Sequence, residues 1–575
     1  MSLDTRRLAV AGVALASTIG LAVCGPAAAP PAPADLVVRH ARVYTVDAVR
    51  SWATTLAVRG GRFVYVGDEA GAEAHIGPAT QTVDAGGRLI LPGFHDAHVH
   101  PISADMEARQ CDLNEAGSRE AVLAAVRACA ARDPAAAWIA GGGWDLTLFP
   151  DASPSKALLD AIEPARPVFL TAADGHSAWV NSRALAIAGI TRETPDPERG
   201  RIERDPATGE PAGTLRESAV DLVGRHVPPA SAADYRAGLD HALARFAEVG
   251  IVGVQEASAG REMLDAYLAA DREGRLTVRV RASLRVDPGR DTDQIPDLVE
   301  LRRAYTGRRL NAGTAKLFLD GVIEAKTAAL LAPYVEGPGA PPRRGDANYD
   351  QARLDRLVAA LDREGFQVHM HAIGDRAIRM GLDAVERARA TNGPRDARHH
   401  MAHIQLFDPA DIPRFAGLGV VANFQPLWAY ADSYIRDLTE PVLGPERSRW
   451  LYPIRSLVAS GAVVAAGSDW SVSSPDPLRA MEVAVTRREP GAPIGPGWIP
   501  EEQVDLPEIV AAYTIAGAYL SVEERDSGSI ETGKLADFVM LDRDIFGLPA
   551  NAIHTAKVVW TVMEGKEVYQ VRSEK

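Results

Sequence analysis

The feature that most constrains the fold is an alternation of apolar, β-rich runs with amphipathic helical stretches along most of the chain. Helical stretches such as YRAGLDHALARFAEV and ARLDRLVAALDREG lie directly before the next apolar run. This alternation is typical of a parallel sheet with crossover helices. Eight runs predict an α/β fold, the TIM (β/α)8 barrel. The runs are residues 91–100, 250–256, 277–284, 312–321, 366–375, 399–405, 419–426 and 462–470.

The spacing of the runs predicts a large insertion in the barrel. The chain has 575 residues, whereas one barrel needs roughly 250. About 150 residues separate the first run from the second, against a few tens elsewhere. We therefore expect the barrel over residues 91–524, with a subdomain of about 104–235 inserted after its first strand.

Both ends of the chain read as short strands separated by turns. Residues 34–90 contain runs such as DLVVRHARVYTV and TLAVRGGRFVYVG, with glycine pairs at the expected turns, and residues 525–575 show the same pattern. We expect these two segments to form one small composite β-sandwich.

The first 33 residues resemble an export signal followed by a tether. Arg6 and Arg7 precede an uncharged run that ends at Cys24, and a Pro-rich stretch follows. Residues 21–24 resemble a bacterial lipobox, which would make Cys24 a lipid-carrying N-terminus and attach the protein to a membrane. Cleavage within 27–29 would instead release the protein. We expect an exported protein, either periplasmic or a membrane-anchored lipoprotein.

Only Cys111 and Cys129 remain beyond the signal. Two cysteines are too few for a disulfide framework or a thiolate zinc site. One bridge could form after export, but we expect two buried free thiols.

The charge of the chain argues against a nucleic-acid partner. The formal net charge is -14, from 62 basic and 76 acidic residues, with no basic patch. A small-molecule substrate is the expected partner, and the sequence leaves open whether the protein forms a homodimer.

His98 and His100 are the first candidate metal ligands. Alternate side chains of a strand share a face, so both histidines point into the barrel if Val99 points outward. Ligand-type residues also lie at the ends of later predicted strands, where TIM-barrel sites assemble. These residues are Lys316, His371, His403 and Asp469.

Six segments carry recognisable motifs: PGFHDAHVH, KLFLDGV, HAIGD, GSDWSV, DGHSAWVNSRAL and GSIETGKLADFVMLD. These motifs resemble those of the amidohydrolase superfamily, and within it the YtcJ-like group (amidohydrolase family 3), which includes N-substituted formamide deformylases. Two departures are His95, where an apolar residue is usual, and Glu256, where an aspartate is common. The resemblance covers nearly the whole chain after the signal.

The resemblance implies a metal centre that holds one or two divalent ions, with zinc favoured and iron, manganese or cobalt as alternatives. Lys316 would bridge two ions if its side chain were carboxylated; otherwise one ion would bind, and Lys316 would pair with an acid such as Asp320. The implied ligands are His98, His100, Lys316, His371, His403 and Asp469.

For several of these ligands the sequence leaves another residue or another role open. His369 shares a strand face with His371, and His399 and His400 precede His403, but we prefer the residues nearest the strand ends. Asp469 could instead cap the next helix.

A second set of residues is expected to contact substrate. Asp174 and His176 could approach a substrate carbonyl or could merely close a turn at Gly175. Trp144 and Trp428 are candidate walls of the substrate pocket, although aromatic residues more often lie in the core. The full set is Trp144, Asp174, His176, Asp320 and Trp428.

The expected reaction is hydrolysis of a non-peptide, amide-type C–N bond. A divalent ion lowers the pKa of bound water to about 7, and Asp469 would act as general acid and base. A lactonase, esterase or phosphotriesterase could use nearly the same centre, because function depends on the loops around a barrel. A non-catalytic periplasmic binding protein is the remaining alternative.

Overall fold

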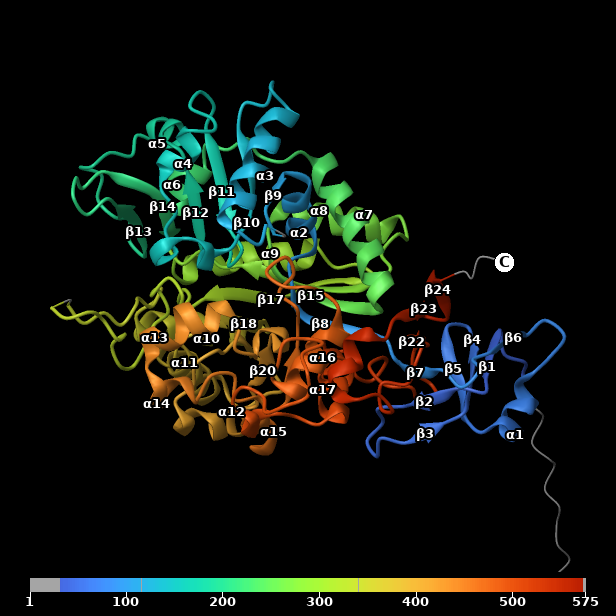
Figure 1. Cartoon of the computed structure of the whole chain (residues 1–575). Coiled ribbons are helices and arrows are strands. Elements are labelled where there is room, and N and C mark those ends of the chain that lie inside the picture. The colour runs from blue at the N-terminus through green and yellow to red at the C-terminus, as the bar shows by residue number, and fades with distance from the viewer. Residues whose placement is uncertain (1–30, 115, 340, 572–575) are drawn as a thin grey trace, which may run out of the picture.

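The computed structural model describes residues 31–571 except 115 and 340. It contains a central barrel, an inserted subdomain and a β-sandwich beside the barrel (Figure 1). The predicted signal and Cys24 lie outside the described residues. None of the described helices has both the length and the apolar character required to cross a membrane.

Eight strands form the barrel sheet, with neighbours hydrogen-bonded in chain order from β8 to β21. This confirms the predicted (β/α)8 architecture. Their side chains are buried along nearly their whole length, as expected for parallel strands covered by helices. The strands are β8 Phe94–Val99, β15 Ile251–Ala259, β16 Arg279–Arg285, β17 Leu310–Phe318, β18 Gln367–Ala372, β19 His400–His403, β20 Val421–Phe424 and β21 Val464–Ala466.

The C-terminal ends of β8 and β21 approach each other closely. This contact closes the barrel beside the predicted metal ligands His98 and Asp469. The Asp469 N–H donates to the His98 carbonyl over 2.7 Å. Asp96 accepts from the backbone N–H groups of His98 (3.1 Å) and Ser468 (3.0 Å). A Cβ atom on Gly467 would lie only 2.5 Å from the His98 nitrogen, so only glycine fits there.

Helices surround the barrel and bury one apolar face each. In α10, Leu354, Leu357, Val358 and Leu361 are buried at helical spacing, and the Asp350 side chain caps the N-terminus by accepting from the Arg353 N–H. The principal helices are α7 Ala232–Val249, α8 Arg261–Arg272, α9 Ile295–Ala304, α10 Gln351–Arg363, α11 Asp375–Asn392, α12 Ile412–Leu418, α15 Ile454–Ala459, α16 Pro477–Thr486, α17 Leu506–Ala512 and α18 Ile515–Leu520.

Strands from both chain ends build the sandwich (Figure 1, blue and red). One sheet has the order β5-β4-β1-β6 and the other β24-β23-β22-β7-β2-β3, and residues of both share one apolar core. The two ends pair directly, with Val539 opposite Leu91. The strands are β1 Leu36–Arg39, β2 Arg42–Tyr44, β3 Trp52–Ala53, β4 Thr55–Arg59, β5 Arg62–Gly67, β6 Gln81–Asp84, β7 Leu89–Pro92, β22 Phe538–Leu541, β23 Val558–Met563 and β24 Lys566–Gln570.

The insert follows β8 and has its own sheet, in the order β13-β14-β12-β11-β10-β9. Its core includes Trp144, Trp179 and Leu170. Its elements are α2 Pro101–Arg109, β9 Cys111–Asp112, α3 Arg119–Arg132, β10 Ile139–Trp144, α4 Lys156–Asp160, β11 Val168–Ala172, β12 Ser177–Val180, α5 Ser182–Ala188, β13 Gly200–Arg204, β14 Pro211–Glu217 and α6 Val220–Gly224.

A disulfide joins Cys111 in β9 to Cys129 in α3, with their Cα atoms 5.6 Å apart. The expectation of two free thiols is therefore wrong. The packing of α3 against the insert sheet brings the two cysteines together, and their spacing of 18 residues gave no sign of this.

Candidate metal centre

The predicted ligands all come from the C-terminal ends of barrel strands. His98 is the penultimate residue of β8, and His100 directly follows that strand. Asp469 follows β21. Lys316, His371 and His403 lie near the ends of β17, β18 and β19. This end of a TIM barrel is where active sites assemble.

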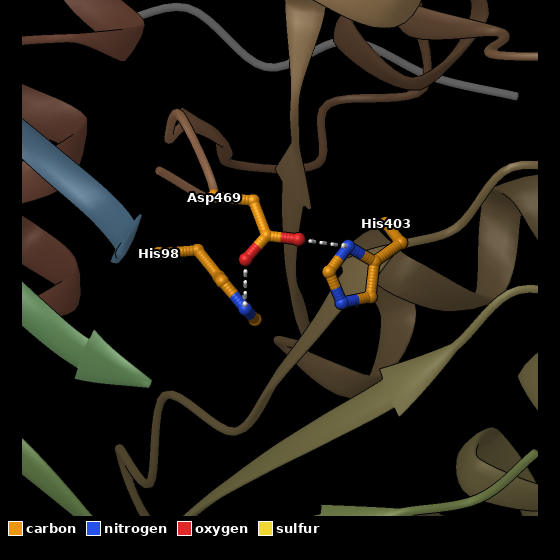
Figure 2. A group of neighbouring side chains, drawn as sticks. All are labelled: His98, His403 and Asp469. Atoms are coloured by element: carbon orange, nitrogen blue, oxygen red, sulfur yellow. Dashed lines mark ion pairs between the residues drawn. The ribbon is translucent and has the colours of Figure 1, made fainter. Parts of the chain in front are cut away.

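The carboxylate of Asp469 lies between histidines from two strands. Its Oδ1 is 3.4 Å from Nε2 of His98 and 3.3 Å from Nε2 of His100. Its Oδ2 is 3.8 Å from Nδ1 of His403. Figure 2 shows Asp469 between His98 and His403; donor atoms of these three residues lie within 4.8 Å of one another.

The separations around Asp469 suit a divalent ion. Donors about 2.0–2.1 Å from a tetrahedral zinc lie roughly 3.4 Å from each other, which matches the measured 3.3 and 3.4 Å. Oδ1 of Asp469 is also buried and has no hydrogen-bond partner among the described residues. A buried carboxylate oxygen without a donor is costly. The donor set therefore fits a bound cation.

Most imidazoles of the centre are neutral at neutral pH. Burial lowers the pKa of His98 and of His371 well below the usual value, and lowers that of His403 to about 3. A neutral imidazole has a lone pair available for a metal.

His100 and Asp469 form an ion pair. Burial alone would lower the pKa of His100, but the carboxylates of Asp469 and Glu256 raise it to about 9. Burial alone would raise the pKa of Asp469, but His100 and His403 beside it hold that pKa below its usual value. A divalent ion would take over the positive charge of His100 and release its proton.

Lys316 is buried without a polar partner. Its Nζ has no hydrogen-bond acceptor within the described part of the chain and lies 4.8 Å from the ring centroid of Phe318. Burial lowers its pKa to about 7. A substantial fraction of this lysine is therefore an uncharged amine at neutral pH.

Asp320 is not the ion-pair partner that sequence offered for Lys316. Its carboxylate accepts backbone N–H groups from Ala329 (2.9 Å), Ile373 (3.0 Å) and Gly374 (2.9 Å). It is 1% exposed. These contacts hold the loops after β17 and β18 in place, and they leave Asp320 little capacity to contact substrate.

The backbone is strained at two of the predicted ligands. His403 has φ 73° and Asp469 has φ 53°, the left-handed region that non-glycine residues seldom adopt. Strain of this kind persists where surrounding structure imposes it and is frequent at functional sites. At Asp469, the N–H bond to the His98 carbonyl supplies part of that constraint.

Of the two competing histidines before His403, His399 has hydrogen-bond partners, whereas both ring nitrogens of His400 are buried without one among the described residues. The ring of His399 accepts from the Val368 N–H at Nδ1, 3.0 Å away, and its Nε2 is 3.1 Å from Asp362. His400 lies deeper in the barrel, with its ring centroid 4.1 Å from that of His369. The structure thus places His403, rather than His399 or His400, beside Asp469.

The insert brings His176 to the barrel site. The ring centroids of His176 and His371 are 5.0 Å apart. Nδ1 of His176 lies 2.9 Å from Glu217, which also accepts from the Thr327 hydroxyl over 2.7 Å. Glu217 thereby links the insert to a barrel loop.

Asp174 closes the turn at Gly175 by accepting from the His176 N–H over 2.9 Å, and Gly175 has φ 71°. Asp174 therefore has the turn-closing role that the sequence allowed. The second carboxylate oxygen of Asp174 is buried without a partner among the described residues.

The two tryptophans differ. Trp428 stacks on His403, with ring centroids 5.6 Å apart and planes 5° from parallel. Trp144 is fully buried in the core of the insert, and its indole N–H donates to the Leu170 carbonyl over 3.0 Å. Packing in the core of the insert accounts for the burial of Trp144.

Of four further residues around the site, three were assigned no role from sequence, and His369 was considered only as an alternative ligand to His371. Glu256 lies 3.7 Å from His100 and accepts from the Tyr267 hydroxyl, and Gln425 lies 2.9 Å from Nδ1 of His403. Glu217 and His369 complete the set. Glu256 and Gln425 end predicted strands, which was the available signal, whereas nothing in the sequence links Glu217 to His176.

Comparison with known proteins gives consistent matches. The sequence profile described as "Amidohydrolase family" matches residues 81–569. The chain is 32% identical to Protein LONG AFTER FAR-RED 3 of Arabidopsis thaliana, covering 93% of this chain and 92% of the relative. It is 30% identical to the putative amidohydrolase YtcJ of Bacillus subtilis, covering 87% and 92%.

Two further matches name an activity or a class. The chain is 28% identical to an N-substituted formamide deformylase of Arthrobacter pascens, covering 93% of this chain and 98% of the relative. Among solved structures, an uncharacterised metal-dependent hydrolase of Pyrococcus furiosus matches with a TM-score of 0.67 and 26% identity, covering 88% of this chain and 99% of the other.

Proposed function

The chain belongs to the amidohydrolase family, and we propose that, as a metal-dependent hydrolase of this family, it cleaves a non-peptide, amide-type C–N bond. The observation that carries the proposal is the convergence of His98, His100 and Asp469 around a buried carboxylate oxygen that lacks a partner. Similarity to a formamide deformylase supports the choice of bond.

We assign His98, His100, His371, His403 and Asp469 to hold the metal, with zinc favoured by the histidine and carboxylate donors. Lys316 would join them as a carbamate: its neutral amine adds to carbon dioxide, losing one proton, and becomes an anionic oxygen ligand. Its pKa of about 7 and unpartnered Nζ support this step. Two ions are expected with the carbamate and one without it.

The ion would supply water of lowered pKa and a positive charge to polarise the substrate carbonyl. Asp469 removes a proton from the attacking water, and the water oxygen bonds to the carbonyl carbon. Asp469 then gives that proton to the amide nitrogen as the C–N bond breaks, so the products are an acid and an amine.

Residues of the insert and of the loop after β20 would bind the substrate. His176, held by Glu217, can donate a hydrogen bond to the carbonyl oxygen from the side of His371. Trp428, stacked on His403, offers an apolar wall beside the reacting group.

We also propose export of the protein. A disulfide such as Cys111–Cys129 persists in oxidising compartments and is rare in the cytosol. The N-terminal motif supports lipid attachment at Cys24, with release after ordinary cleavage as the alternative.

Replacing Asp469 with Asn tests the mechanism. The amide keeps one oxygen for the metal but cannot carry the proton, so we expect metal content near that of the parent and turnover reduced by about 10²- to 10⁴-fold. Metal analysis and steady-state kinetics on an N-substituted formamide are the measurements. Asp437→Asn, at an exposed position, is the matched control. Unimpaired turnover by a metal-loaded Asp469→Asn variant would refute the role of Asp469.

A further inference from the structure

A chain of buried polar side chains runs beneath the metal centre and ends on His98. Nδ1 of His98 is 2.9 Å from Nε2 of His369, and Nδ1 of His369 is 2.9 Å from the Ser283 hydroxyl. The amide nitrogen of Gln255 donates to that hydroxyl oxygen over 2.7 Å. The four residues come from β8, β15, β16 and β18, and each is at most 1% exposed.

The geometry points to His369 as a positioning residue that fixes the tautomer and orientation of His98 for metal binding. This inference rests on the metal site proposed above. Of the four residues only His98 would touch the metal; His369, Ser283 and Gln255 would act through it.

The directions of the hydrogen bonds follow from which nitrogen of His98 faces Asp469. That nitrogen is Nε2, at 3.4 Å from Oδ1. A metal needs the lone pair of Nε2, so the ring proton of His98 must be on Nδ1 and is donated to Nε2 of His369. The proton of His369 is then on its own Nδ1 and is donated to Ser283.

Ser283 can accept both bonds. A hydroxyl oxygen has two lone pairs, one for His369 and one for the amide of Gln255. Every link therefore joins a donor to an acceptor while both imidazoles stay neutral.

This chain also explains why His369 is a poor ligand itself, although it shares a strand face with His371. Both ring nitrogens of His369 already have partners at 2.9 Å. Among the described residues, His371 makes one hydrogen bond through its ring, 3.2 Å from Nε2 to the Gly321 carbonyl, and the same nitrogen lies 3.7 Å from Asp320. Its ring centroid is 4.6 Å from that of His403.

The test is the zinc affinity of purified variants, measured by competition with a chromophoric chelator. His369→Leu removes the acceptor for His98, and we expect zinc affinity to fall about 10- to 100-fold, the range for lost outer-shell partners, at unchanged stoichiometry. His369→Gln places an amide near the former Nε2 and should recover most of the affinity.

Two variants separate this effect from damage to the fold. Ser283→Ala removes the acceptor for His369 and should weaken zinc binding less than His369→Leu does. His399→Gln changes another buried histidine, one bonded to Asp362 and not to the proposed ligands, and should leave the affinity unchanged. Circular dichroism establishes which variants are folded.

Three results would overturn the inference: parental affinity in His369→Leu, loss of one whole zinc equivalent in that variant, or parental affinity in Ser283→Ala. If His369→Leu does not fold, the zinc affinity of Ser283→Ala alone tests the inference. Failure of the parent protein to bind zinc would instead count against the proposed function, so the two failures are distinguishable.

Discussion

At the residue scale, the metal centre buries polar atoms whose burial lowers the free energy of unfolding. Oδ1 of Asp469 and Nζ of Lys316 are buried without hydrogen bonds among the described residues. Burying such a group without a hydrogen bond costs free energy of folding, and the ion pair with His100 offsets this cost in part for Asp469. A cation that binds only the folded state would recover part of this cost and stabilise the protein.

His176 and Glu217 make stability depend on pH. Burial alone would lower the pKa of His176, but the carboxylate of Glu217 raises it to about 9. The raised pKa contributes stability that is fully present below the unfolded-state pKa of about 6.5 and is lost as pH rises through 9. We expect a contribution on the order of 3 kcal/mol.

Chemical denaturation of parent and His176→Gln at pH 6 and pH 10 measures this contribution. The difference in unfolding free energy between the two proteins should be large at pH 6 and small at pH 10. His226→Gln, at an exposed position, is the control. An equal difference at both pH values would contradict the pairing.

The sequence indicates which residues form the site, but it does not indicate every side chain that contacts them. The spacing of His98 and His100 follows from strand alternation. The same alternation makes His369 and His371 equivalent, and only their depth in the barrel and their hydrogen bonds separate them. Glu217 could not be found because its contact with His176 depends on how two strands of the insert pair.

At the scale of elements, the eight barrel strands were predictable because each apolar run is bounded by a helical pattern of a different period. The insert was predictable as a gap of about 150 residues between runs. Its internal sheet was not, because β9, β10 and β11 are parallel whereas β12, β13 and β14 pair antiparallel.

The disulfide should stabilise the insert. Closing a loop of 18 residues removes conformational freedom from the unfolded chain, which corresponds to about 3 kcal/mol. Replacing both Cys111 and Cys129 with Ser should therefore make the insert more sensitive to limited proteolysis and heat, and reductant should do the same to the parent.

The double serine variant should be indifferent to reductant, which provides the control. Titration of free thiols in protein from an oxidising compartment should find neither Cys111 nor Cys129. Two reactive thiols at these positions in unfolded, unreduced protein would contradict the disulfide and weaken the proposal of export.

At the scale of the whole molecule, ion pairs join the C-terminal part of the chain to the barrel. Arg279 of β16 forms ion pairs with Asp537, Glu564 and Glu523, and is itself buried. The composite sandwich was predictable because both ends share one strand-and-turn pattern. These ion pairs were not, because they join residues more than 240 positions apart.

The substrate is the property that neither barrel nor ligand set determines, because loops and the insert shape what reaches the metal. His176 and Trp428 approach the centre from the insert and from the loop after β20. In the proposed reaction they would constrain the substrate carbonyl and the group next to it, but not the group attached beyond the C–N bond.

The most direct test of the central claim is hydrolysis by protein stripped of metal and then reloaded with zinc or manganese. The panel would contain N-substituted formamides, N-acyl amino acids and aryl esters. We predict that stripped protein is inactive and that reloaded protein cleaves amide-type members in preference to the esters. Equal hydrolysis by stripped protein, or no hydrolysis by metal-loaded protein, would contradict the account.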